Sequence, residues 1–395
     1  MQANTSHIFE EAKKTFLATQ KLNVIAISAF IPTLRMFGSF LVGPLVDRIG
    51  HSVPMFAGTL IVFVTAIGYA LASSILVLFV SAAIHGAGSS LIMVSGLSML
   101  TRTFTKKKEM KKAFGLSLAV AASGTAVGPM FGSLVDICQN RQATFFSYAG
   151  MVALLGFVQL FCNCLKVQRV EKKKQSSKER ENKMSVDITD SYNLAALQGL
   201  MITGLVLGSL CSSFSSWPAR FNSFDSPLDL ALASGMAGLQ LGATMAYFLP
   251  ISSCPWMAET LELMIVIIGL FSLTVWTSSI VTAVSMCAIG LGCGMVVSSI
   301  YAALSYSVET KNNSKYGSVF AMAILVIDVG FTTVLWSASG IVPVMGFDIW
   351  MWIMALNFLL FVASCVVNEL WIKQIVLNAL KKRRRHNSKI TINNI

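Results

Sequence analysis

The chain has 395 residues, of which 55% are hydrophobic and 12% charged, with a mean hydropathy of +0.69 and a net charge of +12. Each membrane crossing by a helix takes about 20 apolar residues, so this composition is typical of a chain with many crossings and excludes a soluble enzyme. The basic balance alone could suggest a nucleic-acid binder. The placement of the charges, described below, argues against that partner.

Residue types that carry chemistry are sparse, and their spacing excludes further classes. The four histidines are scattered, and the eight cysteines lie mostly inside or at the ends of apolar runs, without the spacing of metal ligands. No glycine-rich loop followed by lysine and serine or threonine occurs, which argues against a nucleotide-driven pump. We therefore expect no metal and no cofactor, and a proton gradient is the energy source that remains open.

Taken in chain order, eleven apolar runs are long enough to cross a membrane as helices. Five of them precede a charged stretch and six follow it, which predicts an all-α integral membrane protein. The expected spans are residues 24–46, 53–72, 75–100, 114–137, 144–165, 194–216, 228–251, 257–276, 280–304, 316–341 and 349–371.

Charge placement predicts the domains and their orientation. Lysine and arginine gather after the third, fifth, ninth and eleventh runs, so the positive-inside rule puts the linker 166–193 and the tail 372–395 in the cytosol. The odd number of spans leaves the polar segment 1–22 on the other side. The helices form an N-terminal group of five spans within 23–165 and a C-terminal group of six within 194–371. The tail either attracts anionic lipid of the cytosolic leaflet or only sets the topology.

The turn after the first run, within residues 41–54, is the most informative stretch. Gly43 allows two helices to approach closely, and Gly50 supplies the backbone freedom of a tight turn. Asp47 and Arg48 lie where a helix end meets water and can pair across the turn. The turn is either a gate between two conformations or an ordinary connection between membrane helices.

Four segments resemble the vesicular monoamine and acetylcholine transporter family, in the same order as in that family. They are GPLVDRIGHSVPMFAG at 43–58, HGAGSS at 85–90, GTAVGPMFGSL at 124–134 and YGSVFA at 316–321. The first and last are specific to the family, and the other two are generic to its superfamily, the major facilitators. The resemblance implies the two-bundle major facilitator fold, with the eleven spans equivalent to helices 2–12 of that fold and its helix 1 lacking.

The resemblance also implies a cytosolic gate at the turn between the first two spans and an antiporter motif in the fourth. The candidate gate residues are Gly43, Asp47, Arg48, Gly50, Gly124, Gly128, Pro129, Gly132 and Glu309. Glycine at every fourth position allows close helix packing, and Pro129 allows a bend. Glu309 matches an acid at the end of the ninth span, where it is expected to be a helix-end or gate partner.

The intramembrane charges of that family are replaced here. At the family's charged positions this chain carries Ile31, Ala82, Val297 and Ile324. Two charges return about one helical turn away, Arg35 after Ile31 and Asp328 after Ile324. An ion pair between them would let both survive in lipid, as a coupling site or as a purely structural pair. His85, in mid-span, is a candidate proton relay or a hydrogen-bonded structural residue.

Together these features predict a transporter of a small organic solute that works by alternating access. The resemblance implies a cationic amine as the candidate solute, proton antiport as the candidate coupling, and a secretory or synaptic vesicle membrane or the plasma membrane as the location. The alternative is a transport-inactive membrane protein of the same fold. The lost charges favour that alternative, while the gate turn and the Arg35 and Asp328 charges favour transport. Neither is an enzyme or a nucleic-acid binder.

Overall fold

A computed structural model of the chain describes residues 30–104, 106–136, 141–170, 191–213, 227–248, 255–275, 278–310, 315–346 and 349–359. Within these ranges the chain forms eleven helices and no strand. The helices are residues 30–49, α2 (Ser52–Leu71), α3 (Ile75–Thr103), α4 (Lys107–Asp136), α5 (Arg141–Val170), α6 (Ser191–Ser213), α7 (Pro227–Phe248), α8 (Pro255–Val275), α9 (Ser279–Thr310), α10 (Tyr316–Met345) and Ile349–Leu359.

These helices confirm the predicted all-α class, and most of their ends agree with the expected spans. The clearest differences are at α4, which begins at Lys107 rather than at residue 114, and at α9, which continues to Thr310 rather than ending at residue 304. Hydropathy marks only the part of a helix that lies in lipid. Lysine and glutamate are good helix formers, so a polar turn can extend the helix beyond the apolar layer.

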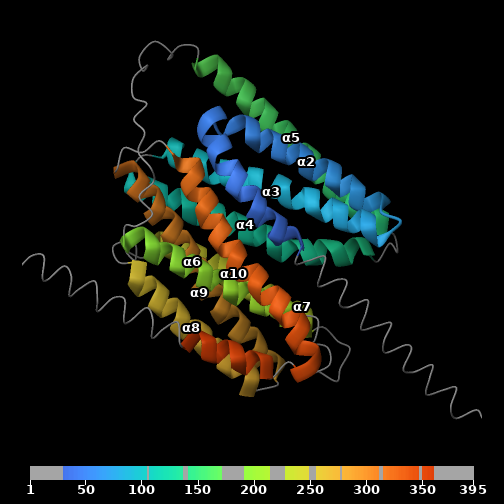
Figure 1. Cartoon of the computed structure of the whole chain (residues 1–395), viewed down its shortest axis with the longest axis vertical. Helices are drawn as coiled ribbons and strands as arrows, with labels where there is room; N and C mark the ends of the chain where they lie inside the picture. The colour runs from blue at the N-terminus through green and yellow to red at the C-terminus, as the bar shows by residue number, and fades with distance from the viewer. Residues whose placement is uncertain are drawn as a thin grey trace, which may run out of the picture.

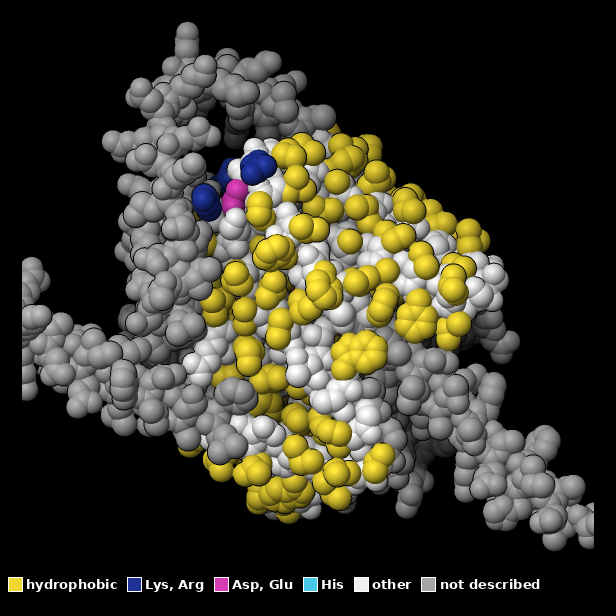
Figure 2. All heavy atoms as spheres, viewed as in Figure 1, with side chains coloured by type: hydrophobic (Ala, Val, Ile, Leu, Met, Phe, Trp, Pro, Cys, Tyr) yellow, Lys and Arg dark blue, Asp and Glu magenta, His cyan; other side chains and the backbone are white. Residues whose placement is uncertain are grey.

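The surface of the described residues is largely apolar. Within the described ranges, five helices are long and apolar enough to span a membrane, and three shorter apolar helices accompany them. Large hydrophobic side chains such as Leu41, Phe157 and Val344 are more than two-thirds exposed. Figure 2 shows hydrophobic side chains over most of one face, with the charged ones gathered at one end. Such a surface suits contact with lipid rather than water.

The helices pack into two groups (Figure 1). In the first, α2 packs against α3 and α5, and the 30–49 helix packs on α3, where a Cβ on Gly86 would meet the backbone of Ile31. In the second, α9 packs against α7 and α8, and α10 packs against α6. The groups meet at two places. α4, which is counted here with the first group, contacts α7 of the second, and α10 of the second group contacts α3 and the 30–49 helix of the first.

Glycine allows the closest helix contact, between α7 and α9. A Cβ on Gly290 would lie 1.9 Å from the carbonyl oxygen of Gly235, and one on Gly238 would lie 2.0 Å from that of Cys287. No side chain fits at such distances. Lipid offers no hydrophobic drive for helix association, so close backbone packing is what holds these helices together.

A pair of alanine substitutions tests this contact. We expect Gly290→Ala to lower the yield of folded protein several-fold, because the new methyl group forces α7 and α9 apart. Gly96→Ala in α3 is the matched control, since no described atom lies within 4 Å of its added Cβ. Fluorescence-detected size-exclusion chromatography of detergent extracts measures both. Equal yields for the two variants would contradict the close contact.

One end of the molecule, here called the basic end, is where the 30–49 helix and α3 end and α10 begins, with Asp47 and Arg102 in contact with the first residues of α10. Arg48, Arg102, Lys106 and Lys315 belong to or follow these helix ends in the sequence, and Figure 2 shows charged side chains gathered at one end. A buried apolar cluster joins the two groups on this side, with members from the 30–49 helix, α3, α4, α6, α9 and α10. Side chains of both groups therefore pack against one another in this cluster, which closes that part of the seam among the described residues.

Candidate functional site

The 30–49 helix and α10 bring Arg35 and Asp328 together. The Nε atom of Arg35 donates to both carboxylate oxygens of Asp328, at 3.1 and 2.9 Å, and Nη2 donates to Oδ1. The Asp328 side chain is 0% exposed, and that of Arg35 is 26% exposed. The ion pair expected from the sequence is therefore present, and it joins the two helix groups.

Close backbone packing fixes the position of Asp328. A Cβ on Gly204 of α6 would lie 2.2 Å from the carbonyl oxygen of Ile327, and one on Gly330 would lie 2.3 Å from that of Met201. The hydroxyl of Thr332 donates to the Asp328 carbonyl at 2.7 Å. α10 therefore lies directly on α6 at this level, and Arg35 from the other group meets a carboxylate on a rigid backbone.

His85 lies beside this pair but belongs to the first group. Its Nδ1 atom is 3.2 Å from the Thr65 hydroxyl on α2, and its ring centroid is 6.0 Å from that of Tyr69. The neighbouring Gly86 packs on the backbone at Arg35. Among the described contacts His85 makes no hydrogen bond to Asp328. Its hydrogen bond to Thr65 suits a structural role, and the proton-relay role stays a prediction.

An aromatic layer separates the ion pair from the basic end. Phe320 lies two turns before Asp328 on the same face of α10. Its ring centroid is 5.8 Å from that of Phe114 on α4 and 6.2 Å from that of Tyr301 on α9. Phe114, Tyr301 and Phe320 are all buried. They close the path from the ion pair to the basic end with side chains from both groups.

Asp47 makes the main polar contact between the groups at the basic end. Its carboxylate accepts from the backbone N–H groups of Gly317 and Ser318, at 2.7 and 2.9 Å, and from the Ser318 hydroxyl at 2.6 Å. These residues form the first turn of α10, whose N–H groups have no partner within the helix. Asp47 thus caps a helix of the other group, and its charge faces the positive end of the helix dipole.

Gly43 makes this cap possible. A Cβ there would lie 2.7 Å from Cβ of Ala321 and 3.0 Å from Cα of Ser318, so any larger residue would push α10 away. The sequence predicted a close approach at Gly43, and its partner is α10. Asp47 turns to α10 rather than to Arg48, which is exposed.

The other gate candidates are less closely placed. Gly50 has φ +93°, a conformation that favours glycine and ends the 30–49 helix. No described atom lies within 4 Å of a Cβ built on Gly124, so its place at a close helix contact stays a prediction. Gly128, Pro129 and Gly132 lie in α4 and Glu309 in α9, and their side-chain surroundings lie outside the described residues.

Two further contacts between the groups were not predicted from the sequence. The hydroxyls of Thr101 on α3 and Ser305 on α9 are 3.1 Å apart and buried. The guanidinium of Arg102 lies over the Tyr316 ring, 5.9 Å from its centroid. No local pattern could have indicated them, because the partners are more than 200 residues apart in sequence.

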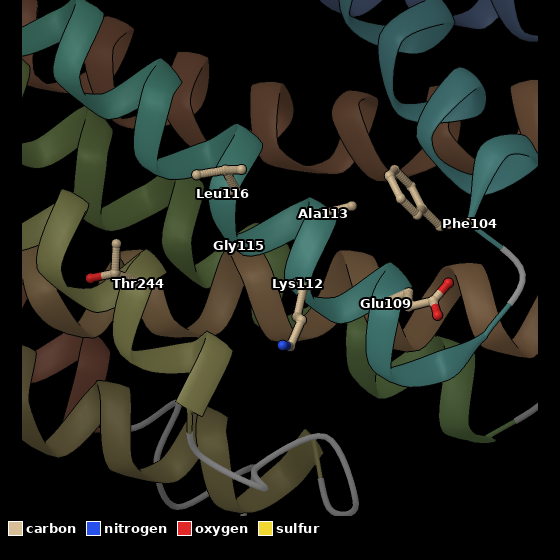
Figure 3. Close-up of a pocket in the computed structure, with 7 residues that line it drawn as sticks. All are labelled: Phe104, Glu109, Lys112, Ala113, Gly115, Leu116 and Thr244. Carbon is tan, nitrogen blue, oxygen red and sulfur yellow. The ribbon is translucent and has the colours of Figure 1, made fainter.

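A cavity of about 600 Å³ lies near the basic end, and Figure 3 shows the residues that line it. It lies beside the start of α4 and reaches Thr244 on α7, at the seam between the two groups. Its lining residues, none of which is a candidate site residue, are Phe104, Glu109, Lys112, Ala113, Gly115, Leu116 and Thr244. The cavity is thus a separate feature from the ion pair.

Residues 17–332 match the sequence profile of the Major Facilitator Superfamily. The chain belongs to this superfamily. It is therefore a multi-pass membrane protein of a family of transporters rather than of enzymes. In major facilitators two helical bundles enclose a central site, and the ion pair here lies between two helix groups in the same way.

Curated relatives of this facilitator include amine and acetylcholine transporters. The synaptic vesicular amine transporter of Mus musculus is 26% identical over 350 residues, which are 88% of this chain and 66% of the relative. The chromaffin granule amine transporter of Homo sapiens is 27% identical, over 87% of this chain and 64% of the relative. The vesicular acetylcholine transporter of Tetronarce californica is 25% identical, over 84% and 64%. The chain thus spans about two-thirds of the length of these relatives.

A solved structure supports the fold. The crystal structure of the human organic anion transporter MFSD10 (TETRAN) superposes on this facilitator with a TM-score of 0.66, at 13% identity, over 87% of this chain and 83% of that one. At this identity the likeness concerns the fold alone. The predicted resemblance to vesicular amine and acetylcholine transporters and the predicted major facilitator fold are therefore both confirmed.

Proposed function

We propose that this facilitator moves a small organic solute across a membrane by alternating access, with its two helix groups moving about the Arg35–Asp328 pair. The observation that carries the proposal is the cap that Asp47 places on α10 of the other group. This cap depends on one side chain, so it can be made and broken without disturbing either helix group, as a gate requires. Under the positive-inside rule the basic end is cytosolic, so the described conformation is closed toward the cytosol.

The relatives suggest the finer properties. Their names include amine transport, synaptic vesicles and chromaffin granules, so we propose an amine-bearing solute and a vesicle or plasma membrane. Proton antiport would use Asp328, the buried acid at the centre, with His85 beside it as a relay. The anionic cytosolic leaflet is the proposed partner of the basic tail, residues 372–395.

A transport-inactive protein of the same fold remains the second candidate. The observation in its favour is the set of apolar residues at positions where the resembling family carries charges: Ile31, Ala82, Val297 and Ile324. Such a protein would keep the two groups packed in one conformation. The two candidates therefore differ in whether the buried seam at the basic end ever opens.

A crosslink across that seam distinguishes them. In a cysteine-free background, Leu97→Cys places a thiol in the buried cluster between the groups. We expect a membrane-impermeant maleimide to label it slowly, whenever the basic end opens. Adding Thr101→Cys and Ser305→Cys, whose parent hydroxyls are 3.1 Å apart, should allow a disulfide that holds the seam shut.

Oxidation should then abolish labelling at position 97, and a reductant should restore it. The control for effects of the oxidant carries Leu97→Cys and Thr101→Cys but keeps Ser305, so that it cannot form the disulfide across the seam. It is oxidised in the same way. If position 97 reacts at no measurable rate in the uncrosslinked protein, while an exposed cysteine at position 48 reacts fully, the inactive candidate holds instead.

A further inference from the structure

We propose that the transported solute carries a carboxylate or a similar oxyanion, which binds the guanidinium of Arg35. This inference rests on the proposed function, and it names the charged group by which the central site recognises its solute. A solute with both an amine and a carboxylate, such as an amino acid, satisfies it. A simple amine does not.

Exposure is the first reason. The Asp328 side chain is 0% exposed, and that of Arg35 is 26% exposed. A solute that enters between the helix groups therefore meets the guanidinium and not the carboxylate. Of the acids whose side chains the structure describes, the other two, Asp47 and Glu109, lie at the basic end. The described part of the central site thus presents positive charge without an accessible negative one.

The hydrogen bonds of the pair are the second reason. A guanidinium has five N–H groups in one plane, and the bonds to Asp328 use those on Nε and Nη2. Nη1 makes no hydrogen bond to any described residue. A carboxylate can therefore bind at Nη1 while the ion pair stays intact, so that Arg35 bridges two anionic groups.

A cation would have to take a different and costlier route. Both oxygens of Asp328 already accept from Arg35, so an ammonium group would have to displace the guanidinium. That would leave the Arg35 charge unpaired at mid-depth in the membrane, which is strongly unfavourable. His85, which lies near Arg35 in the same helix group, adds a second side chain that can donate to an anion.

Two sets of probes with matched carbon skeletons test the charge requirement. The aromatic set is 3-phenylpropionate, phenylalanine and phenethylamine, and the aliphatic set is hexanoate, norleucine and pentylamine. Each is added to the purified protein, and thermal unfolding is followed by intrinsic fluorescence. We expect the carboxylate-bearing members of at least one set to raise the melting temperature in a saturable way, and the two simple amines to leave it unchanged.

Variants tie the response to Arg35. The double variant Arg35→Gln with Asp328→Asn removes both charges together, so it leaves no net charge imbalance, and it should weaken carboxylate binding about tenfold or more. Arg35→Lys keeps the charge and loses the planar fork, so it should give an intermediate loss. Lys106→Gln removes an exposed cation at the basic end and is the matched control, with binding expected as in the parent.

A response to the amines alone, a response to no carboxylate, or equal responses in the double variant and the parent would overturn the inference. The labelling of position 97 described above needs no solute, so it reports on alternating access separately. Opening of the seam without any carboxylate response overturns this inference alone. A seam that never opens overturns the proposed function itself.

Discussion

Replacing Arg35 by leucine should reduce the yield of folded protein several-fold. The variant leaves the Asp328 carboxylate, which is 0% exposed, without the partner that donates to both of its oxygens. Removing one member of a buried ion pair typically costs about 3–5 kcal/mol, because the remaining charge stays desolvated. Asp328→Leu should be similarly harmful, since it leaves the Arg35 guanidinium without its partner within an apolar helix.

The double variant Arg35→Leu with Asp328→Leu should recover much of the lost yield, because two apolar side chains can be buried there without the desolvation cost of a lone charge. The measurement is a double-mutant cycle on the folded fraction in detergent extracts, with uptake into vesicles measured beside it. If the pair serves transport, yield returns and uptake stays absent. Additive losses without recovery would show that the two residues do not depend on each other.

An exposed ion pair provides the control for that cycle. At the basic end, Nζ of Lys106 lies 3.3 Å from Oε1 of Glu109, and the two side chains are 79% and 52% exposed. Surface pairs contribute about 0–1 kcal/mol, because water and salt screen them. Lys106→Gln, Glu109→Gln and their combination should therefore leave the yield within experimental scatter. A large effect there would mean that the extraction assay responds to any change of charge.

Replacing Asp47 by alanine should open the basic end. The change removes three hydrogen bonds to the first turn of α10 and the charge that faces its dipole. Loss of such a cap costs about 1–2 kcal/mol, which shifts a two-state equilibrium about 5–30-fold. Labelling of Leu97→Cys by the impermeant maleimide should accelerate by that factor, while expression stays close to the parent level.

Asp47→Asn separates the charge from the geometry. Asparagine keeps one acceptor oxygen for the α10 backbone, so its effect on labelling should be smaller than that of alanine. The disulfide between Thr101→Cys and Ser305→Cys should form more slowly in the alanine variant, because its partners spend less time in contact. Unchanged labelling at normal expression would leave residues 41–54 as an ordinary turn.

Local patterns account for most of the helices. A run of apolar residues predicts a membrane helix whatever it packs against, because the backbone must satisfy its own hydrogen bonds in lipid. The same rule misses the ends of α4 and α9, where polar turns continue the helix into water. Gly50 and its turn are local as well, since a positive φ is a property of one residue and its neighbours.

The site was predictable only in part. That Arg35 and Asp328 must meet follows from the cost of a lone charge in lipid, so two isolated charges in apolar runs already imply a pair. The sequence could not show that Arg35 is the more exposed of the two, because exposure depends on how α6 and the 30–49 helix pack around α10.

The sequence by itself determined the class of the protein, the approximate positions of the helices that the structure describes, and the two charges of the central ion pair. Each of these depends on the contrast between lipid and water along one stretch of chain. Only the tertiary structure decided that Asp47 caps α10 and that Thr101 meets Ser305. These partners are more than 200 residues apart, and helices of equal hydropathy can pack in many registers. Small residues such as Gly43 and Gly317 select one register by letting the backbones touch.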